Sequence, residues 1–416
     1  MKIKKMDNKI KYFFLLFFIL FFLCMCSHGL EEKTPPSTPA TLIYMIADNN
    51  LDYYAMQNIR QMERGLPDNA APVFVFLTRR IGANPSHPYL LKITQNKEDN
   101  IIRSPIVQTY RQQNTADPAF LRQVITDVKN HSKKNNAQLR RLVLWSHGTG
   151  WLPEGAPFDE IDFNYTATTA KNRAAAFSFG LYETGYGDGT EYQKEMCIKD
   201  LARALEGERF ELLIMDACFM GTIEVAYELR ETSEYFIMSP AEITSGGFPY
   251  EEIMSYLVSP EIEPLAIAVK FFNNYYNLKG ALQTAAVSVI NTRYLEDLAD
   301  AMKTVYNDYA QYRDYIPITN FLQYDRTGSN YFFDFWDFVS RVSEQTQNDY
   351  SHVRKIYNNV LPYYLRTPKI FDFLDIIGTS GLSVYIPNTH DLRDELHEYY
   401  KSLAWTRNSN AVLLFD

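Results

Sequence analysis

The chain has 416 residues, of which 46% are hydrophobic and 22% are charged, a composition typical of a globular protein with one large domain or two smaller ones. Its formal net charge is −9, and no basic tract follows the extreme N-terminus. Because phosphate binding requires clustered Lys and Arg side chains, these features argue against a nucleic-acid partner.

Residues 1–26 are predicted to form a lipoprotein signal peptide. Lysines precede an apolar run, Tyr12–Met25, that is shorter than the roughly 20 residues of a membrane-spanning helix. Cys26 ends a stretch that resembles a loose lipobox, so we expect a lipid on Cys26; cleavage without lipidation is the alternative. The protein is then expected to be exported to the outer membrane or cell surface, or alternatively to be periplasmic or secreted. Residues 27–40 are polar and proline-containing, and they predict a flexible tether.

Short apolar or β-branched runs alternate with amphipathic segments from residue 41 onward, which predicts an α/β fold. Runs such as LVLW and ELLIM are continuously apolar, and strands of this kind are buried on both faces. We therefore expect a mostly parallel sheet flanked by helices on both faces. The predicted strands are 41–47, 71–78, 141–146 and 211–215, and the predicted helices are 51–64, 119–131, 195–205 and 219–230.

The folded part is expected to divide into a core at 41–260 and a C-terminal extension at 261–416. Further strands are predicted at 235–238, 284–290 and 382–386, and a helical region is predicted between about 295 and 370. We expect these elements to extend the same sheet. The segment 148–189 carries prolines and glycines without a clear period, and it is predicted to be a mobile insertion.

Two reactive side chains follow two of the predicted strands. His147 follows strand 141–146, and Cys218 follows strand 211–215. Because sites in parallel sheets lie beyond the carboxyl ends of the strands, we expect these side chains to meet. A thiol attacks as the thiolate, which a neighbouring imidazole and the N-terminus of the helix expected at 219–230 would favour. The pattern predicts Cys218 as a nucleophile and His147 as its general acid and base.

Two neighbouring residues complete the predicted site. The backbone N–H groups of Gly148 and Cys218 are candidates for an oxyanion hole, because glycine allows close approach of a substrate. Asp216 precedes the nucleophile by two residues, so strand alternation would place it on the same face as Cys218. Taken singly, a cysteine after a strand is more often a buried apolar residue, and a Cys197–Cys218 disulfide is an alternative. The conjunction of the two loops favours the catalytic interpretation, with Cys197 as a structural residue on a helix.

At these residues the chain resembles the caspase-like peptidases, which include caspases, legumain, gingipain and clostripain, and it is most similar to the clostripain family. The resemblance rests on IYMIADNNLDYYA at 43–55, LVLWSHGTGW at 142–151 and IMDACFMGTIEVAYELR at 214–230. Less specific support comes from DFWDFV at 334–339 and SGLSVYIP at 380–387. The resemblance implies a caspase-like fold and cleavage of peptide bonds by a Cys–His dyad with no third catalytic residue.

The resemblance also implies roles for acidic and basic residues. Asp216 matches an acid of the pocket for the side chain before the cleaved bond, where the family prefers Arg or Lys. The stretch SPAEITSGGFPYEE at 239–252 departs from the family pattern, because Glu242 retains one acid and a second acid has no clear match. Family members are often activated by cleaving themselves between the two loops, and Lys171 and Arg173 are the candidate positions here.

The expected partners are protein or peptide substrates, with no nucleic acid and with membrane contact only through a lipid anchor. Calcium is required by some family members, but no EF-hand loop occurs, so we expect no cofactor and no metal ligands. Acids such as Asp159, Glu160 and Asp162 are predicted to be solvated.

Other functions are less well supported by the sequence. No G-x-S-x-G, H-E-x-x-H or G-x-x-x-x-G-K-[ST] motif occurs, which argues against a serine hydrolase, a metalloprotease and a nucleotide hydrolase. The remaining alternative is a catalytically inactive surface lipoprotein that keeps the peptidase fold and binds peptide or glycan. Its aromatic runs at 271–276 and 331–336 would supply the binding surface, although such runs more often belong to a core.

Overall fold

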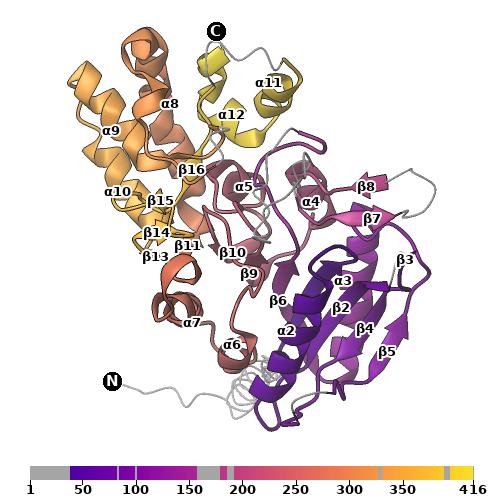
Figure 1. The fold of residues 1–416 in the computed structure, drawn as a ribbon. Helices are drawn as coiled ribbons and strands as arrows, with labels where there is room; N and C mark the ends of the chain where they lie inside the picture. The colour runs from indigo at the N-terminus through magenta and orange to yellow at the C-terminus, as the bar shows by residue number, and fades with distance from the viewer. Residues whose placement is uncertain are drawn as a thin grey trace, which may run out of the picture. The chain divides into compact units, whose positions relative to one another are not determined.

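A ten-stranded sheet forms the centre of the folded unit, with the strand order β13-β11-β10-β9-β6-β1-β2-β4-β5 and β3 paired to β2 (Figure 1). The computed structural model describes residues 38–81, 84–98, 101–156, 179–184, 192–326, 330–387 and 394–415. The five central strands are mutually parallel: β1 (Thr38–Ala47), β2 (Val73–Ile81), β6 (Ala137–Trp145), β9 (Phe210–Asp216) and β10 (Ser233–Met238). The outer strands are antiparallel to their neighbours: β3 (Asn84–Pro85), β4 (Tyr89–Lys92), β5 (Ile106–Thr109), β11 (Ala286–Asn291) and β13 (Tyr363–Arg366). The predicted mostly parallel α/β sheet is confirmed.

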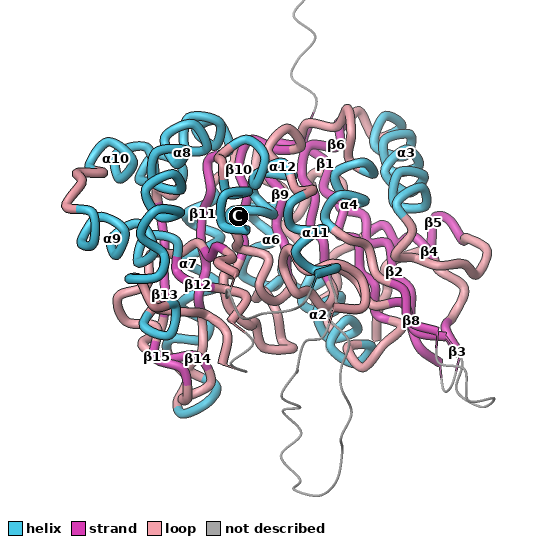
Figure 2. The backbone as a smooth tube through the Cα atoms, turned by 90° about the horizontal axis from the view of Figure 1, so that it is seen from above, coloured by secondary structure: helices cyan, strands magenta, loops and turns pink. Residues whose placement is uncertain are grey.

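Helices cover both faces of this sheet, and the strands run between the two helical layers (Figure 2). One face packs against α2 (Asp52–Gly65), α6 (Tyr250–Leu257) and α7 (Pro264–Tyr276). The apolar cluster on the other face includes residues of α3 (Pro118–Lys134), α4 (Ile198–Ala204), α5 (Ile223–Glu228), α8 (Leu295–Tyr312), α9 (Phe335–Thr346), α10 (Ser351–Val360), α11 (Asp394–Lys401) and α12 (Ala404–Asn408).

Strand β1 shows why the sheet is buried on both faces. Its alternate residues Leu42, Tyr44 and Ile46 belong to one apolar cluster. The intervening residues Ile43 and Met45 belong to the cluster on the opposite face. Successive side chains of a strand point to opposite faces, so a continuously apolar strand contributes to two cores at once.

Several boundaries differ from the sequence-based prediction. β1 begins at Thr38, so the end of the predicted tether is part of the sheet. The strand predicted at 382–386 is reduced to β16 (Ser383–Val384), which pairs with β12 (Phe333–Asp334) in a separate small sheet and does not extend the main one. Two further short pairs are β7 (Tyr182–Thr184) with β8 (Tyr192–Lys194), and β14 (Lys369–Ile370) with β15 (Leu374–Asp375).

The segment predicted to be a mobile insertion is partly packed into the protein. Trp151 is fully buried and packs against Tyr385 in a tilted arrangement, with ring centroids 4.6 Å apart. Phe179 is also fully buried. The sequence does not indicate these contacts, because isolated buried aromatic residues in a polar, glycine-rich segment give no periodic pattern.

Asp334 joins the two C-terminal motifs. Its carboxylate accepts hydrogen bonds from the backbone N–H of Ser380 (2.6 Å), the Ser380 hydroxyl (2.9 Å) and the Tyr324 hydroxyl (2.7 Å). It also accepts from the backbone N–H of Asp337 at 2.9 Å, which caps α9. Burial nevertheless raises the pKa of Asp334. Hydrogen bonds between Asp334 of DFWDFV and Ser380 of SGLSVYIP therefore join the two motifs, which gives both a structural role.

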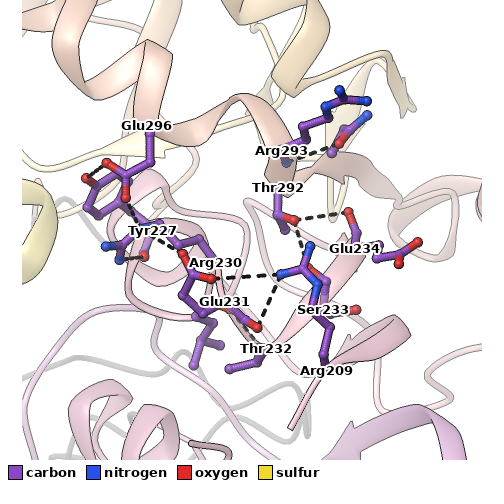
Figure 3. A network of polar contacts seen from close by, with 12 residues as sticks. Arg209, Tyr227, Arg230, Glu231, Thr232, Ser233, Glu234, Thr292, Arg293 and Glu296 are labelled. Atoms are coloured by element: carbon purple, nitrogen blue, oxygen red, sulfur yellow. Dashed lines mark hydrogen bonds and ion pairs between the residues drawn. The ribbon is translucent and has the colours of Figure 1, made fainter. Parts of the chain in front are cut away.

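A polar network fastens the extension to the amino-terminal end of β10 (Figure 3). The Thr292 hydroxyl donates to the carbonyl oxygens of Ser233 (2.7 Å) and Glu234 (3.2 Å). The Tyr227 hydroxyl donates to Glu296 at 2.6 Å, which links the end of α5 to the first turn of α8. This network lies at the amino-terminal ends of the parallel strands, whereas sites in such sheets lie at the carboxyl ends. We therefore assign it a role in the fold and not in the site.

Some of the sequence-based predictions lie outside the described residues. These are the lipidation site Cys26, the self-cleavage candidates Lys171 and Arg173, and the acids Asp159, Glu160 and Asp162. In the part of the chain that the structure describes, no helix is long and apolar enough to span a membrane.

Candidate active site

His147 and Cys218 lie just beyond the carboxyl ends of adjacent parallel strands. Trp145 of β6 is opposite Asp216 of β9, and the Ser146 N–H continues the ladder to the Asp216 carbonyl at 3.3 Å. His147 and Cys218 are each two residues beyond that paired position. The two loops touch, because a Cβ placed on Gly148 would lie 2.8 Å from the carbonyl oxygen of Cys218. The structure therefore brings the two predicted residues to one rim of the sheet.

The sulfur of Cys218 contacts the backbone of Ile243, in the loop after β10. The Ile243 N–H donates to Sγ at 3.3 Å, and the thiol can donate to the Ile243 carbonyl oxygen, 3.6 Å away. A backbone N–H directed at the sulfur stabilises the thiolate relative to the thiol. The loop after β10 thus directs a backbone N–H group at the Cys218 thiol.

The helix predicted to start beside Cys218 begins later, at Ile223. Phe219 has a left-handed backbone with φ of 59°, which a continuing right-handed helix does not allow. The Thr222 hydroxyl also accepts the N–H of Val225 at 3.1 Å, so α5 is capped by its own sequence. The backbone N–H directed at Sγ is therefore that of Ile243 and not one from the first turn of α5.

The His147 imidazole has a partner that the sequence analysis did not identify. Its Nε2 lies 2.6 Å from Oδ1 of Asn50, which follows β1. A signal was present in the sequence, because ADNN follows a predicted strand just as the His-Gly and Asp-Ala-Cys segments do. Only the strand order shows that β1 is the neighbour of β6.

A groove of about 790 Å³ adjoins the loop after β10, whose Ile243 contacts Cys218. Ile243, whose backbone contacts Sγ, forms part of its wall, and residues 244–249 continue that wall. Tyr54 and Gln61 of α2 lie on one side. Leu282 and Phe371 complete the apolar part of the lining. Its size suits a short stretch of peptide.

Asp216 is covered by the loop after β10. Its side chain accepts hydrogen bonds from the Phe248 N–H (3.1 Å) and the Tyr250 hydroxyl (2.9 Å), and the residue is only 4% exposed. A Cβ on Gly247 would lie 2.6 Å from the carboxylate, so this glycine sits directly over it. Burial raises the pKa of Asp216 to about 6, and the two hydrogen bonds oppose that rise. Strand alternation predicts that Asp216 and Cys218 lie on the same face. That argument does not apply, because β9 ends at Asp216 and Cys218 lies outside the strand.

Glu242 also has an internal partner. It forms a two-point ion pair with Arg326, with Nη2 2.9 Å from Oε1 and a second contact between Nε and Oε2. The two side chains are 11% and 5% exposed. Neither Asp216 nor Glu242 lines the groove, whose acidic residues are Glu251 and Glu252.

The remaining cysteine and the aromatic runs have structural roles. Neither Cys197 nor Cys218 forms a disulfide, so the alternative of a disulfide between them is wrong. Cys197 precedes α4, and burial raises the pKa of its thiol. Tyr331, Phe332 and Phe333 are at most 1% exposed, so this run belongs to the core and offers no binding surface. In the run at 271–276, Phe271 and Tyr275 are buried, whereas Tyr276 is 49% exposed. Among the residues that the structure describes, no group of three or more His, Cys, Asp or Glu side chains is arranged to hold a metal ion.

Comparison with known proteins agrees with this architecture. The sequence profile of the clostripain family matches residues 43–410. The chain is 26% identical over 244 residues to clostripain of Hathewaya histolytica, a match covering 54% of this chain and 43% of that protein, so the chain spans less than half of that relative.

Solved structures share the fold over most of its length. A secreted C11 cysteine protease from Bacteroides thetaiotaomicron, in complex with an irreversible peptide inhibitor, has a TM-score of 0.70 at 24% identity and covers 90% of this chain and 99% of its own. An inactive zymogen C11 protease from Parabacteroides distasonis has a TM-score of 0.69 at 28% identity with the same coverage. Since the family match extends through the His147 and Cys218 segments and nearly to the C-terminus, the chain belongs to the clostripain family of cysteine peptidases.

Proposed function

We propose that the protein is a cysteine endopeptidase in which Cys218 is the nucleophile and His147 the general acid and base. The observation that carries the proposal is the paired register of β6 and β9, which sets the two residues at equivalent places on one rim. The Ile243 N–H at the sulfur and the adjoining groove support the same assignment. These features fit a nucleophile with an open approach for a peptide.

The proposed reaction has two stages. The Cys218 thiolate attacks the carbonyl carbon of the peptide bond, and the C–N bond breaks as His147 gives its proton to the departing amine. A water molecule deprotonated by His147 then hydrolyses the thioester and releases the carboxylic acid. Backbone N–H groups of Gly148 and Cys218 are assigned to stabilise the oxyanion formed at each stage.

We assign the preference for Arg or Lys before the cleaved bond to Asp216. Glu242 is already neutralised by Arg326, so it adds no net charge to the site. Asp216 is a buried acid whose ionised form is destabilised by desolvation, and an incoming cation would relieve that cost. Access requires displacement of the glycine that covers it, Gly247, which has no side chain to obstruct the path.

Processing and location complete the proposal. Self-cleavage after Lys171 or Arg173 would divide the chain between the two catalytic loops, and a lipid on Cys26 would hold the enzyme at the bacterial surface. Mass spectrometry of the purified protein tests both, because cleavage gives two chains with defined ends and lipidation adds acyl mass to the N-terminal peptide.

The central test is a peptide-library digestion by wild type, Cys218→Ala and Cys197→Ala. We expect cleavage by wild type and Cys197→Ala, with Arg or Lys enriched before the cut, and none by Cys218→Ala. An acyloxymethylketone probe should label Cys218 and leave Cys197 unmodified. Equal digestion by Cys218→Ala would overturn the nucleophile assignment, and an inert wild type that still binds peptide would favour a non-catalytic role.

A further inference from the structure

Three neighbouring strands carry polar residues just beyond their carboxyl ends. Cys218 follows β9, His147 follows β6 and Asn50 follows β1, and these strands are adjacent and parallel. Parallel strands end at one rim of the sheet, so the residues lie along it in that order with the histidine on the middle strand. The sequence order, in which Asn50 comes first, hides this arrangement.

The contact between Asn50 and His147 restricts the chemistry of the imidazole. Oδ1 of Asn50 lies 2.6 Å from Nε2 of His147. An amide oxygen only accepts hydrogen bonds, so Nε2 must carry a proton to form this one. The proton exchanged with the thiol and with the leaving amine is then assigned to Nδ1, because the two ring nitrogens of a neutral imidazole take opposite roles.

The backbone that presents Asn50 is held firmly although its own side chain is exposed. The preceding residue, Asn49, is 1% exposed and donates to the carbonyl oxygens of Leu181 (2.9 Å) and Ile46 (3.3 Å). Its Oδ1 accepts the N–H of Leu51 at 2.9 Å, directly before α2. The turn is therefore fixed from both sides, as expected of a group that orients another.

We propose that Asn50 is a positioning residue that fixes the orientation and tautomer of His147. This inference rests on the proposed function, since it assumes that His147 transfers protons during catalysis. A single exposed hydrogen bond contributes little to folding stability. The role predicts a loss of turnover without a comparable loss of stability or of substrate binding.

The test compares wild type, Asn50→Ala and Asn50→Asp, with Tyr53→Phe as a matched control. Tyr53 is 64% exposed, and its hydroxyl accepts a hydrogen bond from Gln57 at 2.8 Å, so the control removes a similar surface contact nearby. The measurements are kcat and KM on a peptide substrate across pH, melting temperature, and the rate at which iodoacetamide alkylates Cys218 in a Cys197→Ala background.

We expect Asn50→Ala to lower kcat by at least about tenfold, with KM changed less than about twofold and the melting temperature unchanged. Asn50→Asp should restore most of the turnover, because a carboxylate oxygen also accepts from Nε2. Its charge should move the alkaline limb of the pH profile upward by about one pH unit. Tyr53→Phe should match wild type in every measurement.

Two results would overturn the inference. The first is an Asn50→Ala variant with wild-type kcat and pH profile, and the second is a loss of activity that tracks a lowered melting temperature and is not rescued by Asn50→Asp. Either can occur while wild type cleaves and Cys218→Ala does not, which separates this failure from failure of the proposed function. If Cys218→Ala cleaves as wild type does, the proposed function fails instead.

Discussion

The Asp216→Asn variant is expected to remove a pH-dependent contribution to stability that originates at the centre of the site. Burial raises the pKa of Asp216 from 3.8 to about 6. At about 1.4 kcal/mol for each pKa unit, the protonated carboxyl favours the folded state by about 3 kcal/mol relative to the ionised one. Because the folded pKa is the higher, this contribution is present below about pH 4 and is lost as the pH rises through about 6.

Asparagine cannot ionise, and its amide oxygen can still accept from the Phe248 N–H and the Tyr250 hydroxyl. We expect the unfolding free energy of Asp216→Asn to increase relative to the parent by about 2 kcal/mol between about pH 4.5 and about pH 8. Urea unfolding measures this, with both proteins in a Cys218→Ala background to prevent self-cleavage. Other titrating groups cancel in the difference because the proteins share them.

A Tyr250→Phe variant supplies the control. It removes a hydrogen bond that lowers the pKa of Asp216, so the loss of stability should shift to higher pH. The reasoning is refuted if the difference in unfolding free energy between parent and Asp216→Asn is the same at both pH values. In a protein that keeps Cys218, Asp216→Asn should also lose the preference for Arg and Lys before the cleaved bond. Asp216 would then lower the unfolding free energy at neutral pH while it provides the specificity.

Two further substitutions test the packing around Cys218. Glu242→Gln removes the negative charge that pairs with the buried Arg326 guanidinium and should lower the unfolding free energy by about 3 kcal/mol in urea titrations; an unchanged midpoint would contradict the buried-pair interpretation. Gly148→Ala should lower kcat/KM by at least about tenfold, since its Cβ would lie 2.8 Å from the Cys218 carbonyl oxygen. Gly155→Ala strains an exposed turn with a φ of 73°, but its Cβ meets nothing within 4 Å, so it should lower stability and leave kcat/KM unchanged. Equal kcat/KM values for the two alanine variants would refute the steric argument.

The central sheet could be predicted because its signal is local. Continuous apolar runs such as ELLIM identify strands buried on both faces, and the amphipathic segments between them identify the covering helices. The shared position of His147 and Cys218 could be predicted for a related reason: each follows such a strand, and the carboxyl ends of parallel strands lie at one rim. The start of α5 was missed because the left-handed backbone at Phe219 belongs to a turn shaped by its surroundings.

The sequence by itself therefore determined the fold class, and it led to the export signal and the roles of His147 and Cys218 as predictions. Only the tertiary structure decided the partners of His147 and Glu242, because Asn50 is 97 residues from His147 and Arg326 is 84 residues from Glu242. The periodicity of apolar residues in a sequence indicates which face of a helix or strand is buried. The hydrogen-bond partner of a side chain depends instead on the strand order and on which loop covers the rim of the sheet. The environment of Asp216 is the clearest case, since the same carboxylate would be an ordinary solvated acid without the loop at Gly247 that covers it.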